Sequence, residues 1–325
     1  MSKKNVVTIG GGTGSFVLLS GLKNYPINIS AIVSMADDGG STGILRDELG
    51  VLPPGDVRQC LLGLSMSSTI LKDLMKYRFD KGTLKGHNFG NIFMAALEKA
   101  TGDFNKGVEE ISKILDVKGE VIPVVNKSVR LHIKLKNGKT IIGENELDHN
   151  EEIRKVGVEK VSLKPSAPAN KRAIEKIKKA DLIVMGLGDH YGSIVPNLLV
   201  KGIPEALRAS RAKLVYVCNP DNKKGQTDGF SLEKYVAEIN RFIGCDRVDI
   251  ATFNNKKIDP ELIRRYQEME GDGVMVKIDG SAKNKYKIIK ADLLQVKNKK
   301  INSKLILQDG NKIAKVIIKI LNNKI

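Results

Sequence analysis

The chain has 325 residues, enough for one large α/β domain, and its formal net charge of +17 favours anionic partners. Aromatic residues make up only 5% of the chain, which disfavours a stacking site for single-stranded nucleic acid. The cysteines Cys60, Cys218 and Cys245 lie far apart, and no apolar run reaches the length of a membrane span, so we expect a cytoplasmic protein without a disulfide framework, structural zinc or membrane contact.

The first elements in chain order are a strand, a glycine-rich turn, a helix and a second strand. Residues 5–10 form a short apolar run that ends in Gly10, which is typical of a buried parallel strand. Helical spacing follows over Ser15–Leu22, and the segment Asn28–Met35 is rich in β-branched residues. A strand–helix–strand start of this kind favours a doubly wound α/β sheet.

The next segment, residues 36–65, is rich in loop-forming residues. Within it, Pro53 and Pro54 predict a helix that begins near Gly55 or Asp56. Helical patterns are then expected over Thr69–Phe79, Gly90–Ala100 and Gly107–Leu115. Residues 119–165 alternate apolar and polar positions around Asn137-Gly138, a strong hairpin signal, and predict an antiparallel β-insert that includes the run VIPVV.

The α/β alternation resumes after the predicted insert. We expect helices over 169–179, 232–243 and 311–321, and strands over 181–186, 213–219 and 248–253. No repeat or low-complexity linker interrupts the pattern. The sequence therefore predicts a single α/β domain over residues 1–325, with a mostly parallel sheet and the insert within it.

Four glycines, Gly10, Gly11, Gly12 and Gly14, follow the first predicted strand. A dinucleotide fingerprint needs GxGxxG, but both possible registers miss the third glycine, and no Gly-Lys-Ser/Thr follows for a Walker loop. Backbone N–H groups at such a turn, with the hydroxyl of Thr13, suit a phosphate or diphosphate. The alternative is a tight turn that only allows close strand–helix packing.

A second glycine-rich loop, DDGGSTG, follows the second predicted strand and contains Gly40 and Ser41. Its acidic pair, Asp37 and Asp38, is expected to hold a ribose diol, orient a sugar hydroxyl or bind Mg²⁺ beside a diphosphate. An Asx-rich turn without a ligand is the alternative. Further candidates lie at a helix start and at two later strand ends: Asn91, Gly188 and Asn219. In an open parallel sheet these loops converge on one crevice.

Several segments together resemble one protein family. They are GGGTG, DDGGSTGILRDELGVLPPGDVRQCLLGLS, HNFGNIFMAALEKATGDF, IPVVNKSVRLHIKLKNGKTIIGE, VPNLLVKGIPEALRAS and VYVCN…QTDGFSLEKYV. In this order they resemble the YvcK-type gluconeogenesis factors, which are related to the CofD-type 2-phospho-L-lactate transferases. The resemblance spans nearly the whole chain.

This resemblance implies a Rossmann-like fold and a regulatory protein that binds UDP-activated sugars such as UDP-N-acetylglucosamine or UDP-glucose. It also implies a role in cell shape and in growth on gluconeogenic carbon sources, with no firm reaction attached. The ligand positions carried over by the resemblance are Gly11, Gly12, Thr13, Gly14, Asp37, Asp38, Asn91 and Asn219.

Three stretches depart from the family pattern. The family loop GPGSLYTSIIPNLLV is here GLGDHYGSIVPNLLV, so that Leu187 replaces a proline and Asp189 a serine. An added carboxylate beside a diphosphate repels it unless a cation intervenes. The family's NLMTQPGET is here NPDNKKGQT, in which Lys223 and Lys224 restore positive charge, and Leu307-Gln308 stands where relatives often carry Arg-His.

Other functions remain open at this stage. The main alternative is an Mg²⁺-dependent transferase that uses a nucleotide-diphosphate-linked donor, with Asp37 or Asp38 as metal ligand. The absence of tryptophan weighs against a flat deazaflavin acceptor, and the missing third glycine weighs against an NAD-dependent dehydrogenase. The sequence leaves a homodimer open, and it names no catalytic residue.

Overall fold

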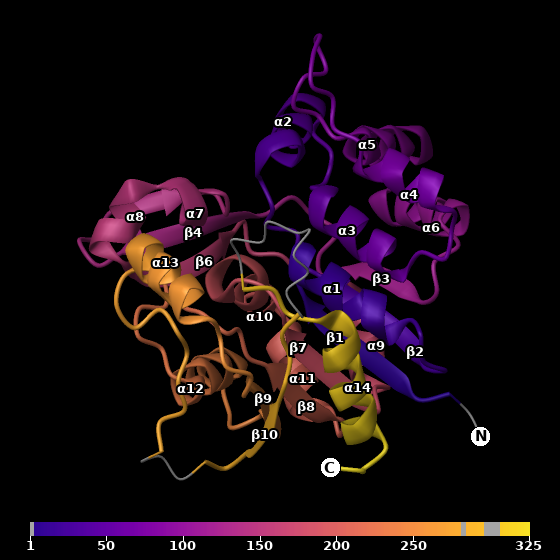
Figure 1. The fold of residues 1–325 in the computed structure, drawn as a ribbon. Helices are drawn as coiled ribbons and strands as arrows, with labels where there is room; N and C mark the ends of the chain where they lie inside the picture. The colour runs from indigo at the N-terminus through magenta and orange to yellow at the C-terminus, as the bar shows by residue number, and fades with distance from the viewer. Residues whose placement is uncertain (1–2, 281–283, 296–305) are drawn as a thin grey trace.

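A computed structural model describes residues 3–280, 284–295 and 306–325. Among these residues, seven parallel strands form one sheet, and three antiparallel strands form a second, smaller sheet. The seven strands are, in spatial order, β10 (Lys287–Ala291), β9 (Ile250–Asn254), β8 (Lys213–Val217), β7 (Leu182–Gly186), β1 (Asn5–Gly10), β2 (Asn28–Val33) and β3 (Glu120–Pro123). This is the expected doubly wound, Rossmann-like α/β architecture (Figure 1).

Strand β1 lies inside the sheet, where it pairs with β2 on one side and with β7 on the other. Its burial on both faces explains the unbroken apolar run in the sequence. Strand order reverses between β1 and β7, because the chain adds β2 and β3 to one side and β7 to β10 to the other. Such a reversal opens a crevice at the carboxyl ends of the two strands.

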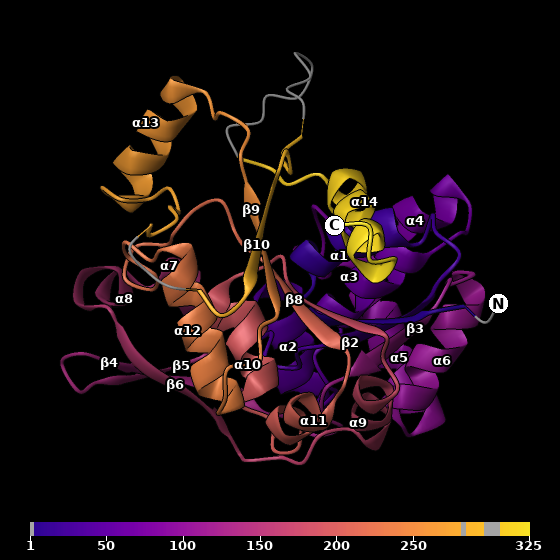
Figure 2. The same ribbon diagram turned by 90° about the horizontal axis from the view of Figure 1, so that it is seen from below.

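Helices cover both faces of the large sheet (Figure 2). One face carries α1, α3 and α14, which pack together, and the opposite face carries α9, α11 and α12. The helices are α1 (Thr13–Leu22), α2 (Gly40–Leu49), α3 (Gly55–Leu64), α4 (Thr69–Lys76), α5 (Phe89–Thr101), α6 (Phe104–Ile114), α7 (Glu146–His149), α8 (Glu151–Val156), α9 (Lys171–Lys178), the π-helix η1 (His190–Ile194), α10 (Val195–Leu198), α11 (Ile203–Ala209), α12 (Leu232–Ile243), α13 (Pro260–Glu270) and α14 (Gly310–Leu321).

The small sheet has the order β5 (Thr140–Ile142), β4 (Arg130–Leu135) and β6 (Val158–Lys164), and the Asn137-Gly138 hairpin joins β4 to β5 as predicted. Alternate residues of β4 are buried, which is the period-2 pattern of a half-buried strand. The hydrophobic core beneath the small sheet also contains Ala36, which follows β2, and Tyr191 and Val195, which follow β7. This shared core places the insert beside the crevice.

The structure corrects the predicted boundaries of the insert. The first three residues of the run VIPVV belong to β3, which pairs with β2 as a parallel edge strand of the large sheet. The small sheet therefore begins only at Arg130. Pro123 is tolerated there because an edge strand has one side without ladder hydrogen bonds. Several elements were not predicted, namely the helices α2, α7, α8, η1, α10, α11 and α13 and the strand β10. Helix α1 begins at Thr13 rather than at Ser15.

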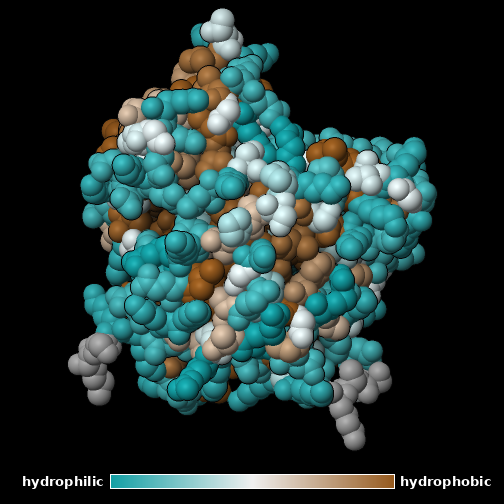
Figure 3. Space-filling view, turned by 180° about the vertical axis from the view of Figure 1, so that it is seen from behind, coloured by the Kyte–Doolittle hydropathy of each residue, from teal (hydrophilic) through white to brown (hydrophobic). Residues whose placement is uncertain are grey.

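The surface reflects the lysine-rich composition. Seen from behind, hydrophilic residues cover most of the molecule, with smaller apolar areas between them (Figure 3). Among the residues that the structure describes, no helix is long and apolar enough to cross a membrane.

Candidate functional site

Two cavities open at the carboxyl ends of the strands, on either side of Thr13. The first, of about 220 Å³, lies beyond β7 and β8, and we call it the β8 cavity. The second, of about 280 Å³, lies beside the start of α2, and we call it the α2 cavity. The exposed Thr13, the first residue of α1, lines both. A ligand that spans the crevice therefore passes over the amino end of α1.

The glycine turn before α1 is packed tightly against the protein itself. A Cβ at Gly12 would lie 2.3 Å from Asp56 Oδ1, and a Cβ at Gly14 would lie 1.9 Å from the carbonyl oxygen of Leu187. The Asp56 carboxylate accepts a hydrogen bond from the N–H of Gly12. Close packing thus explains these glycines without a ligand. Of the predicted residues Gly11, Gly12 and Gly14, only Gly14 lines a cavity, and diphosphate binding at this turn stays a prediction.

The predicted acidic pair divides between two roles. Asp37 lines the α2 cavity, and its Oδ1 accepts a hydrogen bond from the N–H of Gly39 (3.0 Å). Asp38 turns towards the insert, where its Oδ1 accepts a hydrogen bond from the N–H of Asn145 (3.0 Å), and it lines neither cavity. Asp38 therefore fastens the insert to the end of β2, which the sequence did not indicate.

The α2 cavity contains the predicted residues Gly40, Ser41 and Asn91. Gly40 has a positive φ of 44°, which the glycine permits at the start of α2. Ser41 Oγ accepts a hydrogen bond from the N–H of Asn88 (3.1 Å). The Asn91 amide joins two segments, because its Oδ1 accepts from Arg58 Nε (2.7 Å). These contacts hold the polar wall of the cavity in place.

Arg58 is the buried cation of the α2 cavity, with 7% of its surface exposed. Burial, followed by the positive charge of Arg78, lowers the pKa of Arg58 to about 10. The side chain remains charged at neutral pH, and its hydrogen bonds go to the neutral oxygens of Asn91 and of the Met75 backbone. It therefore offers positive charge to a ligand. Arg58 thus lies in the cleft and not on the outer surface.

The loop after β7 is strained. Gly186, Leu187 and Gly188 all have positive φ values, of 124°, 58° and 138°. A leucine in the left-handed region is uncommon, and proline, whose φ is close to −65°, cannot adopt this conformation. Leu187 therefore has a backbone conformation that a proline at this position could not adopt. Asn219 supports the loop, because its Nδ2 donates to the carbonyl of Gly188 (2.8 Å).

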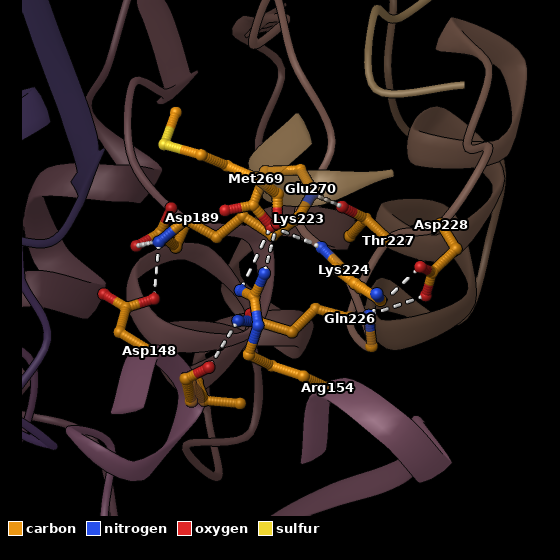
Figure 4. A network of polar contacts seen from close by, with 12 residues as sticks. Asp148, Arg154, Asp189, Lys223, Lys224, Gln226, Thr227, Asp228, Met269 and Glu270 are labelled. Carbon is orange, nitrogen blue, oxygen red and sulfur yellow. Dashed lines mark hydrogen bonds and ion pairs between the residues drawn. The ribbon is translucent and has the colours of Figure 1, made fainter. Parts of the chain in front are cut away.

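The carboxylate of Asp189, the other unusual residue of this loop, forms an ion pair with a lysine. Lys223 Nζ donates to Asp189 Oδ2 (2.8 Å) and to Asp148 Oδ1 (2.6 Å) of the insert (Figure 4). The two carboxylates raise the pKa of Lys223 although its burial opposes this. The added carboxylate of Asp189 is thus neutralised by Lys223, as the sequence allowed. The same lysine ties three segments together at the rim of the β8 cavity.

Glu144 of the insert also lies near the crevice, although it was not among the predicted residues. Burial, followed by the negative charges of Asp56 and Asp37, raises the pKa of Glu144 to about 9. Burial also raises the pKa of Asp37, and burial together with Asp37 raises that of Asp56 well above its usual range. No local motif marks Glu144, because only the docking of the insert brings it to these aspartates.

A magnesium site was the second expectation for Asp37 and Asp38. Their carboxylates point apart, one into the α2 cavity and one into the insert. Within residues 3–280, 284–295 and 306–325, no three histidine, cysteine, aspartate or glutamate residues are grouped so that they could hold a metal ion. Only Asp37 of the pair therefore faces a cavity, and a magnesium site made by both residues stays a prediction.

The chain is similar to proteins of known families over almost its full length. The family model described as 2-phospho-L-lactate transferase CofD matches residues 6–294. The gluconeogenesis factor of Bacillus subtilis is 37% identical over 321 residues, which cover 98% of each chain. That of Halalkalibacterium halodurans is 41% identical over 278 residues, which cover 85% of each chain. A crystal structure of a UPF0052 family member from Bacillus halodurans superposes with a TM-score of 0.87, with 36% identity and coverage of 98% of this chain and 99% of that one.

Proposed function

The chain belongs to the CofD family, with gluconeogenesis factors among its relatives, and from this premise we propose that it binds a nucleotide sugar of the UDP-N-acetylglucosamine or UDP-glucose type. The diphosphate lies over the start of α1 at Thr13, and the two ends of the ligand occupy the two cavities. The protein acts by binding, as a regulatory sensor of the nucleotide sugar in the cytoplasm.

The observation that supports this proposal most directly is the position of Thr13. It is exposed at the amino end of a ten-residue helix, and it is shared by both cavities. The cap residue Gly12 has no side chain to satisfy the first-turn N–H groups, so an anion can accept hydrogen bonds from them. The buried charge of Arg58 adds attraction for an anionic ligand.

The polarity of the two cavities suits the two ends of a nucleotide sugar. The α2 cavity carries Asp37, Arg58 and Asn91, which offer acceptors and donors to sugar hydroxyls. The β8 cavity has apolar walls that include Val17 and Leu187, which suit a flat base. A role in cell shape and in growth on gluconeogenic carbon sources is the cellular part of the proposal, and it comes from the resemblance alone.

The transferase alternative needs a divalent cation, and Asp37 and Asp38 do not converge to hold one. The observation in its favour is the match of residues 6–294 to the family model described as 2-phospho-L-lactate transferase CofD.

Thermal-shift measurements test the proposal, because a ligand that binds only the native state raises the melting temperature. We expect UDP-N-acetylglucosamine or UDP-glucose to raise it, and Thr13→Val to remove most of the rise. Thr140→Val, at an exposed position of β5 away from the crevice, is the control and should keep the full response. A rise with NAD alone, or an equal rise in Thr13→Val, would refute the proposal.

A further inference from the structure

His190 is buried without a hydrogen-bond partner at the β8 cavity. Only 3% of its surface is exposed, and neither ring nitrogen has a partner among the residues that the structure describes. Buried polar groups in native proteins are nearly always paired, so an exception calls for an explanation. His190 also lines the cavity, which makes a ligand the natural partner.

Aromatic rings hold His190 in this position. Its ring makes edge contacts with Tyr191, Phe230 and Tyr235, at centroid distances of 4.8, 6.1 and 5.4 Å. The residue begins η1, and π-helical turns are rare and often occur at functional sites. These three rings enclose the imidazole and separate it from bulk water.

The buried imidazole is neutral at physiological pH. Burial lowers the pKa of His190 to about 4, against the smaller opposite effect of Glu238. A neutral imidazole presents one N–H donor and one acceptor nitrogen. Because the two nitrogens point in divergent directions, each can exchange one hydrogen bond with an uncharged polar group of a ligand.

The surroundings of the β8 cavity narrow the choice of group. Val17, Leu187, Pro220 and Ile306 give it apolar walls, which pack against the faces of a flat ring. The buried Arg58 lies in the other cavity, beyond Thr13. A heterocyclic base fits a cavity that combines these apolar walls with the neutral imidazole and with amide side chains such as Asn219 and Gln226.

We propose that His190 is a specificity-determining residue, which exchanges hydrogen bonds with the polar edge of the ligand's base in the β8 cavity. This inference rests on the proposed function, since it assigns the base end of the same ligand. It explains why the protein keeps a buried polar side chain that the free protein leaves unsatisfied. The ligand supplies the missing partner.

The variant His190→Phe separates this role from a structural one. Phenylalanine keeps a ring among the three aromatic neighbours and removes both nitrogens, so the melting temperature of the free protein should stay the same or rise. The affinity for UDP should fall about fivefold to tenfold, whereas that for pyrophosphate, which has no base, should not change. His132→Phe, on β4 of the insert, is the control and should change neither affinity.

Nitrogen NMR of the histidine rings gives a second measurement. The chain has four histidines, so the loss of one set of signals in His190→Phe assigns that ring. On wild-type protein, UDP should shift both His190 ring nitrogens, and pyrophosphate should not.

The outcomes distinguish the two proposals. If neither UDP nor the UDP-sugars bind the wild type, the proposed function fails, and this inference fails with it. If UDP binds the wild type, but His190→Phe binds it equally well and the ring signals do not move, the inference alone is overturned.

Discussion

Glu144→Gln should change how the stability of the protein depends on pH. The carboxyl group of Glu144 lies close to η1, since its Oε1 is 2.6 Å from the position of a Cβ added to Gly192. Four aspartates act on this carboxyl group: Asp148 of the same insert, and Asp56, Asp37 and Asp189 of other segments. Glutamine has nearly the same shape and cannot ionise.

The sign of the effect follows from the raised pKa. The pKa of Glu144 in the folded protein is about 9, against an ordinary value of 4.5. Below 4.5 the group is protonated in the folded and the unfolded protein, so it does not affect the pH dependence. Between 4.5 and 9 the unfolded chain releases a proton that the folded protein keeps, and stability falls as pH rises.

The size of the effect is about 1.4 kcal/mol for each pH unit in that range. From pH 6 to pH 8, wild-type protein should therefore lose roughly 3 kcal/mol more free energy of unfolding than Glu144→Gln does. The raised pKa values of Asp37 and Asp56 add to the slope of both proteins.

Urea denaturation at pH 6, 7 and 8 measures this difference directly. Glu151→Gln, at an exposed position of α8 in the same insert, is the control, and its curves should run parallel to those of the wild type. If the difference between wild type and Glu144→Gln is the same at all three pH values, the inferred burial of this carboxyl group among other acids is wrong.

Three further substitutions or reagents test the structure. Gly14→Ala should cost about 3 kcal/mol or more in denaturation experiments, because its Cβ would meet the Leu187 carbonyl at 1.9 Å, whereas Gly280→Ala, with open space around it, should be nearly neutral. Leu187→Pro should lower the melting temperature by several degrees, since its φ of 58° is closed to proline; an unchanged melting temperature would contradict this backbone path. A thiol reagent should modify one cysteine rapidly in the native protein, and mass spectrometry should locate it at Cys245, which is the exposed one; rapid reaction of the two buried cysteines would contradict the fold.

Local signals predicted most of the large sheet and the central feature of the insert. Short apolar runs predicted the strands around the glycine turn, and the turn residues Asn137-Gly138 predicted the hairpin. Both signals lie within a few residues of the element that they predict. The strand β3 was assigned to the wrong sheet because its partner, β2, lies about ninety positions earlier in the chain. Helix α2 was missed because Gly40 and Gly43 mask its helical pattern.

The candidate site was predictable in its location and less so in its details. Thr13, Asp37 and Asn91 do reach the crevice, as expected from loops at neighbouring strand ends. Asp38 does not, because Asn145 of the insert pairs with it, and no pattern near Asp38 signals that partner. The unsatisfied ring of His190 likewise depends on the packing of two rings from distant segments, Phe230 and Tyr235, which a linear sequence does not display.

The contact between α1 and α14 bears on how the protein is made. The two helices touch through glycine, since a Cβ at Gly21 would lie 2.1 Å from the Gly310 carbonyl oxygen. Almost the whole described chain separates them, so the ribosome finishes α1 long before its neighbour emerges. Until α14 has been synthesised, the apolar side of α1 that packs against it stays exposed, and chaperones can bind this surface. We therefore expect a nascent chain to become able to bind its ligand only late in synthesis.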